Sequence, residues 1–226
     1  MSKKAELIGS HFPTIYLTVI SLLQGIALSQ LVPNIITYLE MADNPWLDIK
    51  LIPLVLMLLV IFIVWHHYAI GIFFLRWFPN IIDTTIPFLV SIGQFILISF
   101  ITIKTSVADI NVESWTIGYA ILLVSGSIGY FGAAFRLEPE LFTNIMSFDN
   151  AVKHCRLANR YYNWSGLFIL FQGLFALLII WLDREQLLLL SLIFMVLFLV
   201  LSEYLLLRMI KPHFIKALDD FEAREK

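Results

Sequence analysis

Residues 51–78 read LIPLVLMLLVIFIVWHHYAIGIFFLRWF, an apolar run that holds two adjacent histidines, His66 and His67. At a rise of 1.5 Å per residue, about 20 apolar residues cross the roughly 30 Å hydrocarbon core of a bilayer. The run therefore predicts a membrane-spanning helix. An ionisable side chain at membrane depth costs about 2.5–3.5 kcal/mol on insertion scales, so both histidines are candidate functional residues.

Similar runs occupy most of the 226-residue chain, which is 60% hydrophobic and only 14% charged. A soluble domain is nearer half apolar and a quarter charged. We predict an all-α, polytopic integral membrane protein whose membrane domain, residues 1–210, is a bundle of six transmembrane helices. The predicted spans cover residues 14–36, 51–76, 82–103, 115–135, 164–182 and 186–209.

The basic residues predict the orientation of these spans. With the N-terminus in the cytoplasm, twelve of the fifteen Lys and Arg residues lie on the cytoplasmic side. The other three are Lys50, Lys104 and Arg184. Such a bias is typical of cytoplasmic loops, and here it alternates correctly only for six spans. Both termini are then cytoplasmic, and we expect the protein in a bacterial inner membrane.

Net charge and cysteine content exclude two further features. The net charge is −2 and no polybasic tract occurs, which indicates no direct nucleic-acid partner. Cys155 is the single cysteine, so no intramolecular disulfide can form.

The predicted cytoplasmic loop, residues 136–163, reads as helical. Pro139 suits a helix start, and Ser147 can cap a second helix that leads into span five. Three basic residues fall on one face of that helix: Lys153, Arg156 and Arg160. They form either a solvated or headgroup-facing stripe, or a site for anionic lipid or a partner protein.

The predicted cytoplasmic tail, residues 211–226, reads as a short amphipathic helix that opens at Pro212. Phe214, Leu218 and Phe221 fall on one side of it. That apolar side can pack on the bundle, on the membrane surface or on another subunit.

Span one carries the most polar side chains. Small and hydroxyl residues recur on one stripe: Thr14, Thr18, Ser21, Gly25 and Ser29. Such a stripe indicates either close helix packing with hydrogen bonds across the interface or the lining of a narrow wet path. Gln24 lies near the middle of the span, where an unpaired amide is costly, and is expected to have a partner.

The two histidines of span two point about 100° apart on a helix, so both cannot face the same neighbour. One can point into the bundle and the other sideways to another helix or subunit. They are neutral imidazoles hydrogen-bonded to other helices, the lining of a proton or ion path, or metal or haem ligands. Every other histidine lies outside the predicted spans, so ligation would require two subunits. We predict no metal and no cofactor.

Other polar residues of the spans read as structural. Gln94 in span three is expected to hydrogen-bond between helices. Glu203 in span six is expected to snorkel toward the cytoplasmic interface, or to contribute a carboxylate to a cytoplasmic vestibule. Ser125, Gly129 and Ala133 in span four have the small-xxx-small spacing of a packing face.

An enzymatic function is not predicted. Intramembrane serine proteases take the histidine of their catalytic dyad from span six, where this chain has none. Their Gly-x-Ser-Gly motif is not reproduced by Val124-Ser125-Gly126-Ser127. Paired intramembrane aspartates and metal-spaced His/Glu motifs are also absent from the sequence.

Trp65-His66-His67, followed by Arg76 and Asp83, is similar to the second span and basic turn of the six-helix potassium channels of lysosomes and many bacteria. Leu23-Gln24-Gly25-Ile26 is the best match to that family's Phe-Ser-Asp-Gly in span one. The resemblance implies a pore constricted at Ile26 and its helical neighbours, with His66 or His67 supporting span one.

The sequence thus favours an oligomeric membrane protein, expected to be a homo-oligomer, that forms an ion-conducting path lined by span one. The alternative is a non-conducting membrane sensor or anchor subunit of a bacterial stress or phage-defence (antiviral) system. In that alternative the cytoplasmic loop and tail bind a soluble partner.

Overall fold

The computed structural model describes the chain except residues 1–2, 45–47, 76–80, 105, 108–109, 144 and 226. It describes the backbone alone for residues 3–16, 72–75, 81–84, 185, 218 and 220–225. Every regular element in the described part of the chain is helical. The elements are α1 (Lys3–Met41), α2 (Leu51–Leu75), α3 (Ile81–Phe100), α4 (Val112–Phe135), η3 (Pro139–Phe142), α5 (Phe148–Trp181), η4 (Glu185–Leu187), α6 (Leu188–Leu205), η5 (Leu206–Ile210) and α7 (Lys211–Glu225).

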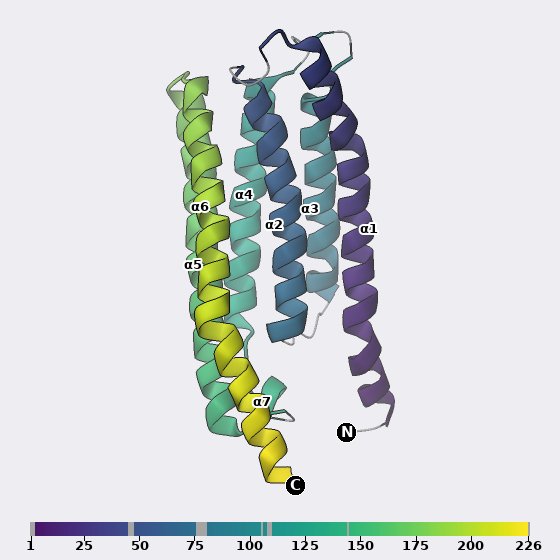
Figure 1. Cartoon of the computed structure of the whole chain (residues 1–226), viewed down its shortest axis with the longest axis vertical. Helices are drawn as coiled ribbons and strands as arrows, with labels where there is room; N and C mark the ends of the chain where they lie inside the picture. The colour runs from purple at the N-terminus through teal and green to yellow at the C-terminus, as the bar shows by residue number, and fades with distance from the viewer. Residues whose placement is uncertain are drawn as a thin grey trace.

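The helices α1 to α6 run side by side as a bundle (Figure 1). Five described segments are long and apolar enough to cross a membrane: Leu17–Met41, Leu51–Gly71, Val112–Phe135, Phe148–Trp181 and Leu188–Ala217. The described apolar part of α3, Thr85–Phe100, is shorter. Helix α1 begins and α7 ends at the same end of the bundle (Figure 1). An all-helical chain with these long apolar helices is compatible with an integral membrane protein.

The tightest helix pair is α4 and α5. A Cβ atom added at Gly173 would lie 3.2 Å from the carbonyl oxygen of Ala120 and 2.8 Å from a methyl group of Val124. One at Gly166 would lie 2.8 Å from the ring of Phe131. Glycine at these two positions therefore lets the helices approach more closely than any larger residue would.

The predicted packing face on α4 is not where this close approach occurs. Ser125 is exposed, and a Cβ at Gly129 would meet nothing within 4 Å. Ala133 alone of the three is buried. The expectation of a small-xxx-small packing face was therefore wrong, because the close contacts use the α5 glycines Gly166 and Gly173.

Helix α5 joins the predicted cytoplasmic helix and span five into one element of 34 residues. Ser147 is its N-cap and accepts a hydrogen bond from the backbone N–H of Asn150, as predicted. Pro139 opens η3, also as predicted. At 1.5 Å per residue α5 is about 51 Å long, so it exceeds the ~30 Å core of a bilayer by about 20 Å.

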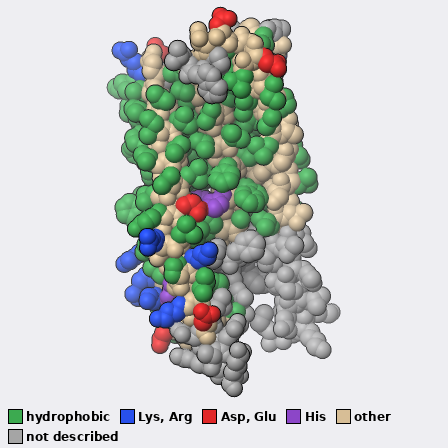
Figure 2. Space-filling view, in the orientation of Figure 1, with side chains coloured by type: hydrophobic (Ala, Val, Ile, Leu, Met, Phe, Trp, Pro, Cys, Tyr) green, Lys and Arg blue, Asp and Glu red, His purple; other side chains and the backbone are tan. Residues whose placement is uncertain are grey.

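Charge is distributed unevenly along the bundle. Hydrophobic side chains cover the upper part of the visible face, and most of its Lys and Arg side chains gather below (Figure 2). The exposed basic residues of α5, η5 and α7 are Lys153, Arg156, Arg160, Arg208, Lys211 and Lys216. The visible face thus has an apolar band along most of the bundle and a basic region at one end (Figure 2).

Helices α6 and α7 continue into each other through the π-helical turn η5. Pro212 is the second residue after this turn, and the N–H of Lys211 bonds to the carbonyl of Leu206. A proline ring clashes with the carbonyl four residues earlier in a regular α-helix. The wider π turn relieves that clash, so the predicted opening of a separate segment at Pro212 becomes a continuous helix.

Candidate functional site

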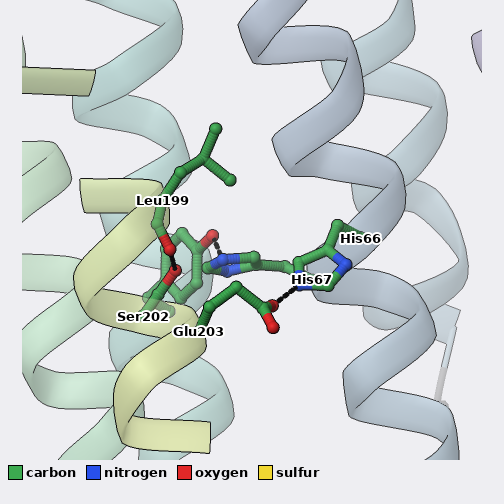
Figure 3. Close-up of polar contacts among 6 residues, drawn as sticks. His66, His67, Leu199, Ser202 and Glu203 are labelled. Atoms are coloured by element: carbon green, nitrogen blue, oxygen red, sulfur yellow. Dashed lines mark hydrogen bonds and ion pairs between the residues drawn. The ribbon is translucent and has the colours of Figure 1, made fainter. Parts of the chain in front are cut away.

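His66 and His67 leave α2 in different directions and reach different helices (Figure 3). His66 pairs with Glu203 on α6, and His67 hydrogen-bonds to Tyr130 on α4. The predicted divergence of the two imidazoles is therefore confirmed. The structure joins α2 to two other helices through adjacent residues.

His67 is nine-tenths buried and lies among aromatic rings. Its ring centroid is 5.4 Å from those of Tyr130 and Phe198, and 5.9 Å from that of Tyr161. The Tyr130 hydroxyl bonds to Nδ1 of His67. Its Nε2 has no hydrogen-bond partner among the described residues.

His66 and Glu203 form an ion pair at the side of the bundle, where both side chains keep partial exposure. The ring of Phe62 stacks on His66 with centroids 5.7 Å apart. Glu203 was predicted to snorkel toward the cytoplasmic interface, but in the structure it pairs with the imidazole of His66. The pair ties α2 to α6 and holds the His66 ring in place.

A signal for this pair was present in the sequence. His66 lies fifteen residues after the first residue of α2, and Glu203 fifteen residues after the first residue of α6. Both helices begin at the same end of the bundle, so both side chains lie about 22 Å from that end (Figure 1). Equal depth between two ionisable groups on parallel helices predicts a pair.

The polar stripe of α1 lies on the outer face of the described protomer. Thr18, Ser21, Gly25 and Ser29 are exposed, and so is Ile26. A Cβ at Gly25 would meet nothing within 4 Å. Ser21 accepts a hydrogen bond of 3.1 Å from Trp65, and Ser29 donates one of 2.7 Å to the carbonyl of Ile26.

Gln24 separates from this stripe. It is only 4% exposed and its amide nitrogen donates to Ser91 on α3 at 3.5 Å. Gln94 is fully buried, but neither of its amide atoms has a partner among the described residues, so the predicted hydrogen bond between helices is not found there. Asn34 accepts a hydrogen bond of 3.1 Å from the backbone N–H of Ile103 just beyond α3. These amides form a polar seam where α1 packs on α3.

The predicted contact residues of the loop and tail fall into three groups. Lys153, Arg156 and Arg160 are exposed on α5. Phe214 is buried on the bundle in a cluster with Phe142 and Ala217, and its ring centroid is 5.3 Å from that of His154. The side chains of Leu218 and Phe221 lie outside the described residues, as do Arg76 and the side chain of Asp83 from the potassium-channel resemblance.

The chemistry available at membrane depth is hydrogen bonding and charge pairing. Within the described part of the chain, no three His, Cys, Asp or Glu side chains converge as a metal site would require. Sequence reasoning missed Tyr130 as the partner of His67 and Ser91 as the partner of Gln24. A hydroxyl at matching depth on another helix was the signal in both cases.

Searches for similar proteins returned no match to a family model, a curated protein or a solved structure.

Proposed function

We propose that this chain is a six-span membrane protein with both termini in the cytoplasm, and that it assembles as a homo-oligomer around an ion-conducting path lined by α1. In this arrangement α3 is the sixth span, since its 20 residues reach about 30 Å. The shared end of α1 and α7 and the basic residues gathered there support the orientation (Figures 1 and 2).

The observation that carries the proposal is the outer face of α1. Thr18, Ser21, Gly25 and Ser29 lie there, away from the core that α1 builds through buried residues such as Ala27 and Leu31. Lipid chains offer hydroxyl groups no hydrogen-bond partners, whereas in a ring of subunits these groups face one another across water. Symmetry then converts one polar stripe into a continuous polar lining.

The same face becomes apolar toward the other end of α1. Val32 and Ile36 are 43% and 51% exposed on it, and Ile26 flanks the hydroxyl stripe. Rings of such side chains form hydrophobic constrictions that gate by dewetting. The proposed path thus has a polar part near the cytoplasm and a narrow apolar part beyond it.

The experiment is ion flux into proteoliposomes that contain the purified protein alone, with K⁺ and Na⁺ gradients applied separately. The proposal predicts flux of at least one cation. It also predicts that Ser29→Leu reduces this flux while the oligomer still assembles. Correctly inserted oligomers without any flux would contradict it.

A second candidate function rests on the exposed basic face of α5. Lys153, Arg156 and Arg160 lie on the part of α5 that extends beyond the core thickness of a bilayer. They suit a non-conducting sensor or anchor subunit that binds an acidic surface of a soluble cytoplasmic partner, as in a bacterial stress or phage-defence system. Stoichiometric copurification with the product of a neighbouring gene, lost in the triple alanine variant, would support this function over conduction.

A further inference from the structure

A pocket of about 120 Å³ lies at the depth of the histidines and is lined by residues of the five helices α2 to α6. Its lining is largely aliphatic, with residues such as Val60 and Ile169, and it also includes His67, Tyr68, Tyr130 and Tyr162. Val60 and His67 are seven residues apart on α2, so the pocket extends roughly 10 Å along the helix. This volume is somewhat below the dry cavity of about 150 Å³ that holds a benzene ring, so a ligand with a six-membered ring would fill the pocket and extend beyond it.

The glycine at position 129 keeps this space open. Gly129 lines the pocket, and a Cβ there would meet no atom within 4 Å. At Gly173 on α5, by contrast, the backbone of α4 already occupies the space that a Cβ would need. The pocket is therefore not a by-product of glycines used for close helix packing.

His67 lines the pocket and has one hydrogen-bonding atom without a partner among the described residues, Nε2. Tyr130 bonds to Nδ1 of His67, and we assign the phenol as donor because an imidazole lone pair accepts more strongly than a phenol oxygen. The neutral ring then carries its hydrogen on Nε2. That nitrogen is buried and has no partner among the described residues, so it needs an acceptor oxygen.

We propose that this pocket binds a lipid-soluble carbonyl compound, whose oxygen accepts a hydrogen bond from Nε2 of His67 and whose apolar body extends toward Val60. The rings of Tyr68, Tyr130 and Tyr162 line the pocket and suit a flat head group. Two sources offer this chemistry, an isoprenoid quinone dissolved in the bilayer and the ester carbonyl of a phospholipid chain. The inference goes beyond ion conduction and does not depend on it.

The test is photocrosslinking of the full-length protein in nanodiscs with two probes. One is a short-tailed benzoquinone that carries a diazirine, and the other is a phosphatidylethanolamine with a diazirine in its acyl chain. Mass spectrometry locates the label. We expect saturable labelling of the pocket segments of α2 and α4, competed by an unlabelled quinone but not by its dimethoxy analogue, which lacks the carbonyls.

Four variants assign the contacts. Gly129→Leu fills the pocket and should abolish labelling, whereas Ser125→Leu, on the exposed side of the same helix, should not. His67→Phe keeps a ring but removes the donor, so we expect the apparent affinity to fall roughly tenfold. His67→Gln restores a donor and should recover part of that loss.

The outcomes test separately which compound occupies the pocket and whether its carbonyl contacts His67. Labelling by the lipid probe alone, with the same dependence on His67 and Gly129, supports the carbonyl site and identifies the phospholipid as its occupant. Labelling that is insensitive to His67→Phe overturns the carbonyl contact. Equal labelling of the parent and Gly129→Leu overturns the proposal. Competition by the dimethoxy analogue also overturns it, and that measurement uses the parent protein alone.

Discussion

His66 and His67 illustrate how two identical neighbours acquire different chemistry from a helix. The 100° step between them directs one ring to a carboxylate at the side of the bundle and the other to a phenol inside it. His66 serves as a clasp between α2 and α6. His67 anchors α2 to α4 and retains one nitrogen for a further contact.

The clasp makes a prediction about stability. Replacing either His66 or Glu203 by alanine should lower the melting temperature in detergent, and the double variant should lose less than the sum of the two. We expect a coupling free energy of about 1 kcal/mol, since both side chains keep some exposure. Strictly additive losses would show that the two groups do not interact.

Cys155 gives a second prediction at this scale. It lies on the first turns of α5, outside the part that we assign to the membrane, and burial, with Glu140 nearby, raises the pKa of its thiol to about 11. The thiolate is the reactive form, so its maleimide reaction at pH 7 should be roughly 100-fold slower than at an ordinary exposed cysteine. Lys153→Cys in a Cys155→Ala background is the matched control, and equal rates would contradict this packing.

Much of the residue-level chemistry could be predicted from the sequence, but its partners could not. The divergence of the histidines and the need of Gln24 for a partner follow from helix geometry and the cost of unpaired groups. The identities of Tyr130, Glu203 and Ser91 depend on which helices are neighbours, and that is set by packing over the whole bundle. Gln24 has the partner that its depth required, and that partner is Ser91 on α3.

At the scale of elements, the α4–α5 pair organises one side of the bundle. Gly173 sits against the α4 backbone, so its environment tolerates no added carbon without a shift of the helix. Gly129 on α4, by contrast, borders open space. Two glycines that look alike in the sequence thus have opposite tolerance.

Substitution of these glycines tests the packing. Gly173→Val should destabilise the protein by about 1–3 kcal/mol through overpacking. Gly129→Ala should leave stability unchanged or raise it slightly, because alanine favours the helix more than glycine does. Thermal unfolding followed by circular dichroism in detergent measures both, and a larger loss for Gly129→Ala would refute the helix pairing.

The predicted helix boundaries agree with the structure where the sequence signal acts within one helical turn. The cap at Ser147 and the start at Pro139 were predicted because a side chain or ring acts within one turn. The sequence predicted a cytoplasmic helix that leads into span five, but not that the two form one helix. The signal for one helix was that no breaker separates residues 148 and 181. The packing face of α4 was misplaced because small residues show where helices can approach, not where they do.

At the scale of the whole molecule, orientation and assembly remain proposals with direct tests. In a Cys155→Ala background, Lys153→Cys should react with a membrane-impermeant maleimide only after the cells are opened. Arg184→Cys, at the other end of α5, should react in intact cells. The reverse labelling pattern would contradict the proposed orientation and would place both termini on the outer side of the membrane.

The central claim is that the outer face of α1 lines a water-filled path, and Ser29 lies twelve residues from each end of Leu17–Met41 on that face. The most direct measurement is K⁺ flux through proteoliposomes that contain Ser29→Cys in a Cys155→Ala background, before and after a charged methanethiosulfonate is added. Flux should fall sharply on modification. Flux that modification leaves unchanged, or its absence from intact and oriented protein, would contradict it.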